Sequence, residues 1–384
     1  MPPFPENLAK KLENRINTQS LRILPKTHQN LIDFSSNDYL GIAQNNQIFK
    51  EAHEFLTTHQ FLKNGSTGSR LLSGNHPLYS QIEELLTTIY RTENALVFNS
   101  GYNANVGFFS SIPQKGDVVL YDELCHASIR EGLQLSNAKS YKYKHLDYTD
   151  LEKKLLQFSA TTTNIYVATE SVFSMDGDVC DLEKLTEITE KYKAYVVVDE
   201  AHSAGYFGKN NTGLVANLAL NNRVFAQIIT FGKAYGCHGA AVLGGKQLIN
   251  YLTNFARSFI YTTALSPHSL ATLWVVLHHL HLENNQDEQK KLVQNIAYFK
   301  ECIIKYNFRA TFIESNSPIQ SCVIGGNERV KKISNYMQTN GFDVKSILSP
   351  TVPEGTERLR FCLHSYNTPQ EINNVLGCLQ EVVL

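Results

Sequence analysis

Asp199 is the first residue whose place in the sequence suggests chemistry. It follows three valines in the stretch Val196–His202, which predicts a carboxylate at the carboxyl end of a buried strand. Ligands of open α/β sheets bind at that edge, so this acid could face a bound molecule. A helix N-cap or a charged strand end would also explain the same residues, and this stretch alone does not separate these alternatives.

A lysine follows the next apolar run of the chain. In the stretch Thr230–Gly236, Lys233 stands between Gly232 and Ala234, whose small size would let a ligand approach the amine. Burial lowers the pKa of a lysine, and the neutral amine is the form that makes an imine with a carbonyl group. The alternative is a surface lysine in a glycine turn.

A third candidate element is an anion site. The segment Asn99–Asn105 follows the apolar run Ala95–Phe98 and is expected to open a helix, whose first backbone N–H groups would bind a phosphate. The segment is neither a P-loop nor a GxGxxG fingerprint, so ATP and dinucleotides are poorly supported. An ordinary strand-to-helix turn has the same appearance.

Histidines and cysteines complete the candidate residues. His126 follows the run Val118–Tyr121 and could contact the same ligand, although a lone histidine is more often structural. The pairs Cys125–His126 and Cys237–His238 are adjacent in sequence, and adjacent residues rarely coordinate one ion. Because no complementary pair stands at ligand spacing, no metal site is predicted.

The elements that must position these residues alternate between strands and helices, which favours an α/β fold with a mostly parallel sheet. A helix is predicted over Pro77–Tyr90, and Asp181 is expected to cap another. Short β-branched or aromatic runs mark the strands, and these are Ala95–Phe98, Val118–Tyr121, Ile165–Thr169, Tyr195–Val198 and Val224–Ile229.

After about residue 265 the pattern changes to long helices and then short strands, which predicts a separate α+β C-terminal domain. We expect an N-terminal segment at 1–45, a large domain at 46–265 and a small domain at 266–384. In the small domain, helices are predicted over Pro267–Leu282, Asp287–Tyr306, Glu328–Thr339 and Pro369–Val383, with strands at Ala310–Ile313, Ile319–Ile324, Asp343–Ile347 and Arg358–Leu363.

Composition limits the classes of function. The 384 residues are 42% hydrophobic and 18% charged with a formal net charge of −1, so there is no basic field to attract nucleic acid or anionic lipid. No run approaches the roughly 20 apolar residues that span a bilayer. The seven cysteines form no CxxC pair, which argues against disulfides and makes the cytoplasm the expected location.

Six motifs in order give the chain a family resemblance. They are Asp33–Gly41, Gly65–Gly74, Leu124–Ser128, Ser171–Asp178, Asp199–His202 and Thr230–Gly236. Together they resemble the α-oxoamine synthases, pyridoxal-phosphate enzymes of fold type I, over roughly residues 10 to 384. The resemblance implies a large domain on a mostly parallel seven-stranded sheet, a smaller α+β C-terminal domain, and a homodimer with shared active sites.

The resemblance also implies roles for individual residues. Lys233 would be the Schiff-base lysine and the proton-transfer base, Asp199 would pair with the pyridinium nitrogen, and His126 would stack on the ring. The remaining cofactor contacts would be Gly101, Tyr102, Ser174, His202, Thr230 and, from a second subunit, Thr262 or Thr263. Substrate contacts would be Arg22, Asn37, Thr351 and Arg360, whose planar guanidinium suits an amino-acid carboxylate.

Within the family, the segment Pro350–Arg360 resembles the branch that joins L-alanine to a pimeloyl thioester, carried by CoA or a carrier protein. Phe255–Thr263 and Pro318–Gln320 agree with that branch. Alternatives are the joining of glycine to an acetyl group, the joining of serine to a long acyl chain, and a non-catalytic binding protein on the same fold. Departures from the branch are Glu200, Ser203 and the pair Cys237–His238.

Overall fold

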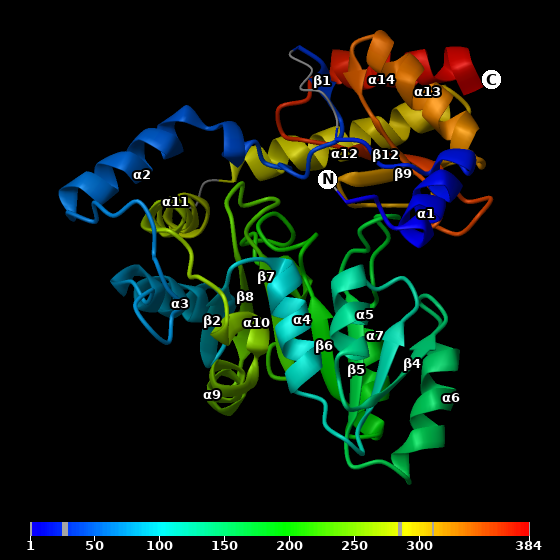
Figure 1. Ribbon diagram of the computed structural model, residues 1–384. Coiled ribbons are helices and arrows are strands. Elements are labelled where there is room, and N and C mark those ends of the chain that lie inside the picture. The colour runs from blue at the N-terminus through cyan, green and yellow to red at the C-terminus, as the bar shows by residue number, and fades with distance from the viewer. Residues whose placement is uncertain (1, 25–29, 283–285, 309–310, 384) are drawn as a thin grey trace. The chain divides into compact units, whose positions relative to one another are not determined.

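A seven-stranded sheet forms the centre of the larger of two units into which the chain divides (Figure 1). The computed structural model describes residues 2–24, 30–282, 286–308 and 311–383. The larger unit comprises Asn37–Ser174 and Val179–Gln289, and the smaller comprises Met1–Ser36, Met175–Asp178 and Lys290–Leu384.

The strand order of the large sheet is β2-β8-β7-β6-β5-β3-β4, and β8 alone among these seven runs antiparallel to its neighbours. This confirms the mostly parallel sheet expected from the sequence. The strands are β2 (Asn94–Phe98), β3 (Val118–Asp122), β4 (Lys139–Tyr143), β5 (Ile165–Glu170), β6 (Tyr195–Asp199), β7 (Ala226–Thr230) and β8 (Ala240–Gly244).

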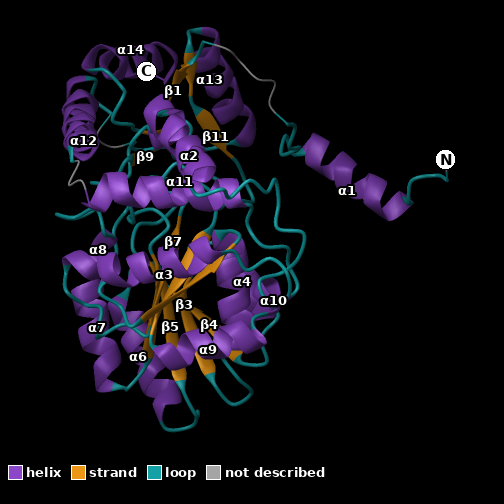
Figure 2. Ribbon diagram, turned by 90° about the vertical axis from the view of Figure 1, so that its left-hand side faces the viewer, coloured by secondary structure: helices purple, strands orange, loops and turns teal. Residues whose placement is uncertain are grey.

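Helices cover both faces of this sheet because its central strands are apolar on both sides (Figures 1 and 2). In β6, Val197 packs into one core while Val196 and Val198 pack into the other, as the two-residue period of a strand requires. The first core holds α4 (Gly101–Ser111), α5 (Ala127–Gln134), α9 (Lys246–Phe255) and α10 (Arg257–Ile260), and the second holds α6 (Tyr148–Ser159), α7 (Leu182–Lys191) and α8 (Gly213–Asn217).

Two helices of the larger unit begin where the sequence predicts. The helix α3 (Pro77–Tyr90) has the predicted bounds, with proline in its first turn. Asp181 caps α7, since its carboxylate accepts a hydrogen bond from the Lys184 N–H at 3.0 Å. The other helical segments of this unit are η1 (Ile42–Gln44), α2 (Asn46–Thr58), α11 (Pro267–Leu277) and the π-helical turn η2 (His278–Leu282).

The smaller unit is built on a three-stranded antiparallel sheet in the order β11-β12-β9. A two-residue parallel pair, β1 with β10, ties the N-terminal segment to the C-terminal part of the chain. Its elements are α1 (Glu6–Asn17), β1 (Ile32–Asp33), α12 (Asp287–Lys305, shared with the larger unit), β9 (Ile319–Val323), α13 (Asn327–Thr339), β10 (Phe342–Asp343), β11 (Lys345–Ile347), β12 (Arg358–Cys362) and α14 (Pro369–Val383).

Two strand predictions in this unit are corrected. The strand expected over Ala310–Ile313 begins at a residue outside the described part, and Phe312 forms only an isolated bridge with Cys322. The strand expected over Asp343–Ile347 is interrupted at Val344, whose buried side chain separates β10 from β11. The single residue Val344 therefore separates two short strands that belong to different sheets: β10 pairs with β1, and β11 pairs with β12.

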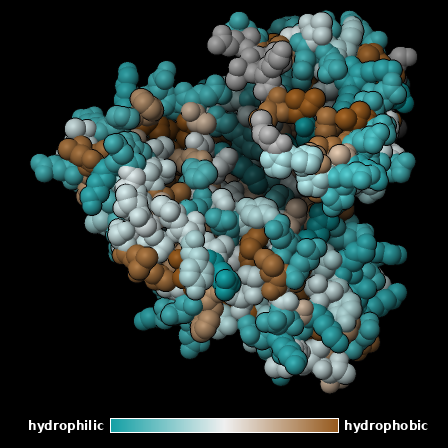
Figure 3. All heavy atoms as spheres, viewed as in Figure 1, coloured by the Kyte–Doolittle hydropathy of each residue, from teal (hydrophilic) through white to brown (hydrophobic). Residues whose placement is uncertain are grey.

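The face of the molecule that Figure 3 shows is mostly hydrophilic, and smaller groups of hydrophobic residues lie among the hydrophilic ones. Within the described ranges, no helix has both the length and the apolar character that crossing a bilayer requires.

Glu200, the residue after β6, is a fully buried carboxyl group that joins the sheet to α8. It accepts hydrogen bonds from the backbone N–H of Leu214 at 2.6 Å, from the Ser203 hydroxyl at 2.9 Å and from the Gln227 amide. Burial raises the pKa of Glu200 to about 7 in spite of these donors.

Glu200→Gln is therefore expected to flatten the pH dependence of stability. Between pH 4.5 and 7 the folded chain keeps a proton on Glu200 that the unfolded chain has lost, so the free energy of unfolding falls as pH rises. Removing this group should reduce that fall by on the order of 3 kcal/mol, measured by urea unfolding of cofactor-free protein. The exposed Glu84→Gln should keep the original slope, and equal slopes in both variants would contradict the burial argument.

Candidate active site

A cavity of about 310 Å³ lies at the carboxyl edge of the large sheet, within the larger unit. Its volume is in the range of small-molecule sites. Eight residues predicted from the sequence line it, namely Asn37, Gly101, Tyr102, His126, Asp199, His202, Thr230 and Lys233. The other lining residues are Ser100, Asn105, Ser128, Glu170, Ala201, Gly232, His238 and Gly239.

Asp199 is the last residue of β6 and is only 4% exposed. Its Oδ2 accepts a hydrogen bond from Asn105 Nδ2 at 2.7 Å, and its Oδ1 accepts one from the Ala201 N–H at 2.9 Å. Both oxygens are therefore held in place by the protein while the residue lines the cavity. The sequence argument required Asp199 and Lys233 to share one site, and they line the same cavity.

Lys233 lies in the loop between β7 and β8, and a neighbouring tyrosine anchors that loop. The hydroxyl of Tyr235 is 2.6 Å from that of Tyr90 and 3.0 Å from Nε2 of His281, and Tyr235 is completely buried. Gly236 has a φ of 59° and is packed against the backbone of Ala43, so a side chain there would be strained and obstructed. The loop is consequently fixed close to the lysine.

His126 caps the N-terminus of α5, and its Nδ1 lies 2.7 Å from the Ser128 hydroxyl. Burial lowers the pKa of His126, the positive charge of Lys233 lowers it further, and Asp199 opposes both. The balance favours the neutral imidazole. A neutral ring is suited to lie flat against an aromatic ligand without adding charge to it.

Glu170, at the end of β5, is a cavity residue that the sequence interpretation missed. Its carboxyl group accepts hydrogen bonds from the backbone N–H groups of His126 at 2.6 Å and Ser174 at 3.3 Å. Burial raises the pKa of Glu170 to about 8, and the nearby Asp199 charge adds to the rise. Glu170 therefore links two loops at the edge of the sheet.

The start of α4, which also lines the cavity, has the features of an anion site. Ser100 caps α4 by accepting a hydrogen bond from the Asn103 N–H at 3.2 Å, and Gly101 and Tyr102 form the first turn. A Cβ on Gly101 would collide with the methyl group of Thr230, so glycine is needed for this close approach. The first N–H groups of an 11-residue helix, beside a threonine, can bind a phosphate.

His202 has a partner that fixes its ring. The hydroxyl of Tyr39 lies 2.7 Å from His202 Nδ1, and both residues are buried. The sequence stretch Asp33–Gly41 gave no role to Tyr39, although the resemblance singled out Asn37 in the same stretch. Tyr39 therefore positions His202 at the cavity from a segment far away in sequence.

Six of the predicted site residues do not line this cavity. In the larger unit, Ser174 donates its N–H to Glu170, and the Asn99 amide contacts Thr263 and lies 3.5 Å from the Thr262 hydroxyl. The other three belong to the smaller unit. There, Arg22 donates to the Thr351 hydroxyl at 3.4 Å, and Arg360 is 7% exposed with its Nη1 2.8 Å from Cys362 Sγ.

The departures from the family pattern differ in consequence. Ser203 donates to Glu200, and neither residue lines the cavity, so this pair acts in the core between β6 and α8. His238 does line the cavity and its side chain is exposed, whereas Cys237 is not a lining residue. Of these departures, His238 is the one that contributes to the shape of the cavity.

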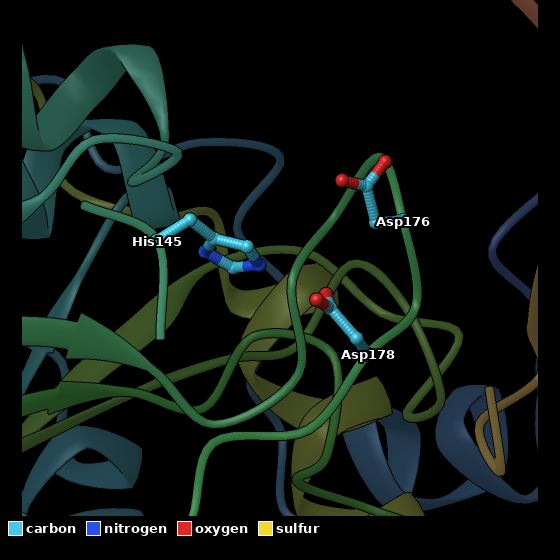
Figure 4. A group of neighbouring side chains, drawn as sticks. All are labelled: His145, Asp176 and Asp178. Atoms are coloured by element: carbon cyan, nitrogen blue, oxygen red, sulfur yellow. The ribbon is translucent and has the colours of Figure 1, made fainter. Parts of the chain in front are cut away.

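The loop between β5 and α7 carries two carboxylates, Asp176 and Asp178, which Figure 4 draws with the imidazole of His145. Asp176 forms a buried ion pair with Arg358 inside the smaller unit. His145 Nδ1 lies 2.9 Å from Asp122 Oδ1 inside the larger unit. An ion pair in the smaller unit and a hydrogen-bonding contact in the larger one thus explain the placement of two of these three side chains.

Comparison with known proteins identifies the family of the chain. Residues 29–379 match the family described as aminotransferase class I and II. The chain is 38% identical over 389 residues to an 8-amino-7-oxononanoate synthase of Emericella nidulans, covering 96% of this chain and 92% of that protein. It is 37% identical over 350 residues to a putative 8-amino-7-oxononanoate synthase of Geobacillus kaustophilus, covering 91% and 88%.

Solved structures extend the likeness to the fold. A lysine-to-alanine variant of serine palmitoyltransferase from S. paucimobilis with a bound PLP–myriocin aldimine superposes with a TM-score of 0.88 at 26% identity, covering 98% of this chain and 96% of that one. An 8-amino-7-oxononanoate synthase from Francisella tularensis gives a TM-score of 0.75 at 29% identity, covering 91% and 97%.

The cavity fits pyridoxal phosphate. It offers an anion-binding helix N-terminus, a neutral imidazole, a buried carboxylate and an amine around one small space. This donor set meets the needs of a phosphate group, a flat ring, a ring nitrogen and an aldehyde carbon. The chain belongs to the aminotransferase class I and II family, within its α-oxoamine synthase branch, and is a pyridoxal-phosphate-dependent acyltransferase.

Proposed function

We propose that this enzyme joins L-alanine to a pimeloyl thioester, carried by CoA or a carrier protein, and releases 8-amino-7-oxononanoate for biotin biosynthesis. A carbon–carbon bond forms between the alanine Cα and the acyl carbonyl carbon, and the carbon–sulfur bond to the carrier breaks. The alanine carboxyl group leaves as CO2, and a proton takes its place on Cα. The products are then the amino ketone, CO2 and the free thiol carrier.

One observation carries the proposal. A lysine and a buried acid line a single cavity, in a chain whose curated relatives named 8-amino-7-oxononanoate synthase share 35–38% of its residues. The two catalytic groups alone support only pyridoxal-phosphate chemistry. The likeness to these named relatives over nine-tenths of the chain supports the choice of alanine and pimeloyl substrates.

Asp199 and Lys233 have the central proposed tasks. When bound, pyridoxal phosphate supplies an electron sink for the bond that breaks at the amino-acid Cα. Asp199 holds a proton on the pyridine nitrogen, and this proton strengthens the pull on the electrons. Lys233 Nζ would hold the cofactor at its aldehyde carbon when no substrate is bound, and it would remove a proton from the amino-acid Cα and return one at the end.

The remaining assignments concern recognition of the cofactor and the substrates. We propose that His126 covers the ring face, that Gly101, Tyr102 and Thr230 hold the phosphate, and that Ser174 and His202 lie near the phenolic oxygen. Arg360 would bind the amino-acid carboxylate, for which its planar guanidinium is suited, and Asn37, Thr351 and Arg22 would contact substrate. The buried position of Arg360 supports a structured binding group rather than a mobile surface one.

An assay tests the substrate proposal directly. Purified enzyme loaded with cofactor is incubated with L-alanine and either pimeloyl-CoA or a pimeloyl carrier protein, and products are identified by mass spectrometry. We expect 8-amino-7-oxononanoate together with one equivalent of CO2. If neither donor gives this product while the cofactor remains bound, the substrate proposal is wrong and the family assignment still stands.

A second candidate reaction has structural support. The serine palmitoyltransferase superposes with a higher TM-score, 0.88, than the synthase at 0.75. The same residues could therefore join serine to a long acyl chain, or glycine to an acetyl group. A panel of alanine, glycine and serine against acetyl, pimeloyl and palmitoyl thioesters separates the three reactions by the pair with the highest kcat/KM.

We also propose that the enzyme works as a homodimer in which Thr262 or Thr263 reaches the phosphate of the partner copy. Both threonines lie beside Asn99, next to the segment that opens α4, yet neither lines the cavity of its own chain. Sedimentation should show two copies per particle, and Thr262→Val or Thr263→Val should weaken cofactor binding. A monomer with full cofactor affinity would contradict the shared site.

A further inference from the structure

Four side chains form a continuous hydrogen-bonded chain in the wall of the cavity. His126 Nδ1 lies 2.7 Å from Ser128 Oγ, Asn105 Nδ2 donates to Ser128 Oγ at 3.0 Å, and the same Nδ2 donates to Asp199 Oδ2 at 2.7 Å. All four residues line the cavity. Asn105 belongs to α4, Ser128 to α5 and Asp199 to β6, so the chain joins three elements.

Chemistry fixes the direction of the two bonds that Asn105 makes, and the Ser128 backbone indicates the direction of the third. A carboxylate only accepts hydrogen bonds, so the Asn105 amide must turn its nitrogen, and not its oxygen, toward Asp199. The second hydrogen of that nitrogen points at Ser128 Oγ, whose own proton is then available for His126 Nδ1. The Ser128 backbone N–H also points at Nδ1, at 3.3 Å, which agrees with an acceptor there. This arrangement favours the neutral tautomer of His126 that carries its proton on Nε2.

The two middle residues are well protected from water. Ser128 is 0% exposed and Asn105 is 2% exposed, and Asn105 Oδ1 accepts no hydrogen bond from the described part of the chain. Water cannot replace a lost partner easily at such a depth, so breaking one bond leaves a neighbouring polar group without compensation. The amide is thus held by the carboxylate and the hydroxyl rather than by contacts of its oxygen.

We propose that Asn105 and Ser128 are positioning residues that couple Asp199 to His126, fixing the carboxylate orientation and the imidazole tautomer before the cofactor binds. The inference rests on the proposed roles of Asp199 and His126 at the cofactor ring, and it is independent of which amino acid and thioester are used. One network then positions both Asp199, the proposed partner of the cofactor ring nitrogen, and His126, the proposed cover of the ring face. A change at either end is transmitted to the other through two neutral side chains.

The first test observes His126 without any cofactor or substrate. Protein labelled with ¹⁵N-histidine is compared as wild type, Asn105→Ala and Ser128→Ala, and a His126→Gln variant assigns the signals. We expect an unprotonated Nδ1 and a protonated Nε2 in wild type, and a shift of both ring signals toward a mixture of tautomers in the two variants. Ser128→Thr, which keeps the hydroxyl, should restore the wild-type signals.

A matched control removes another buried hydroxyl near the same helix pair. Ser111, at the end of α4, donates to the Gly107 carbonyl at 2.6 Å and takes no part in the network. Ser111→Ala should leave the His126 signals unchanged. If Asn105→Ala and Ser128→Ala also leave them unchanged, the proposal is wrong, because a purely structural role would not require the tautomer to be fixed.

The second test measures coupling through cofactor affinity. Asn105→Ala should raise the dissociation constant of pyridoxal phosphate by about tenfold, since a hydrogen bond to a charged group is lost. Adding Ser128→Ala to Asn105→Ala should change the dissociation constant little further. The fold increase in the dissociation constant of the double variant should therefore be much smaller than the product of the two single fold increases. If the fold increase of the double variant equals the product of the two single fold increases, the residues act independently and the proposed coupling is wrong.

These readouts separate the inference from the proposed reaction. Neither uses an amino acid or a thioester, so a failed product assay leaves them interpretable. Asn295→Ala, which removes another buried amide that donates to two backbone carbonyls in the smaller unit, controls for general loss of stability. It should lower the unfolding temperature without changing cofactor affinity, and a fall in affinity equal to that of Asn105→Ala would overturn the specific role.

Discussion

Lys233→Ala is expected to abolish turnover and remove the visible absorbance band of the bound cofactor. Lys233 lies in a loop anchored by the buried Tyr235, and it is the lysine among the residues that line the cavity with Asp199. A positioned proton-transfer group contributes about 10²–10⁴-fold to a rate, and kcat should fall at least that far. Stopped-flow and steady-state kinetics with alanine and a pimeloyl thioester measure the loss.

The matched control is Lys246→Ala, at the first position of α9, where the side chain is exposed. This variant should keep both the absorbance band and kcat. Because an exposed lysine and a cavity lysine differ only in position, the comparison isolates the site. A Lys233→Ala protein that retains both properties would assign the amine role to another residue and remove the basis of the proposed chemistry.

The central strands could be predicted from sequence because a strand buried on both faces is a continuous run of apolar, mostly β-branched or aromatic residues. β3, β5 and β6 begin at the predicted residues and extend one residue further than expected. β4 and β8 were not predicted. β4 (Lys139–Tyr143) lies at the edge and exposes most of its side chains, and β8 (Ala240–Gly244) is rich in small residues, so neither has the β-branched run that signals a buried strand.

The same reasoning explains which site residues were found. Asp199 and Lys233 each follow an apolar strand, and the parallel order of β6 and β7 brings their ends together at one edge. Glu170 ends β5 with the same signal, an acid after an apolar run, and the sequence interpretation nevertheless overlooked it. The predicted strand before Asp199 was also one residue short, so the same signal was present at both positions and was used at only one of them.

Asn105 and Ser128 could not be identified in that way. Both lie inside helices, where a single polar residue carries no periodic signal, and their role depends on the distance between α4 and α5. The glycine at position 132 permits this distance, since a Cβ there would meet the Phe109 side chain and the Asn105 backbone of α4. Tertiary packing of two helices, rather than any local pattern, creates the network.

Asp199→Asn is the second change for which a large effect is expected. The amide has nearly the same shape but cannot hold a proton on the ring nitrogen, and its nitrogen would oppose the Asn105 amide that now donates to Oδ2. Breaking a buried charge interaction costs about 3–5 kcal/mol, so kcat/KM should fall roughly 10²-fold or more. Asp199→Glu keeps the charge and should recover part of the loss.

The control for this prediction is Asp117→Asn, at the other end of the sheet. Asp117 is also buried, 3% exposed, and its carboxylate accepts from the Asn164 N–H at 3.1 Å and the Gln114 N–H at 2.8 Å. Losing this charge should lower stability and leave kcat/KM per folded molecule unchanged. If the two variants lose activity equally, the acid at the end of β6 acts through the stability of the sheet and has no special relation to the cofactor ring.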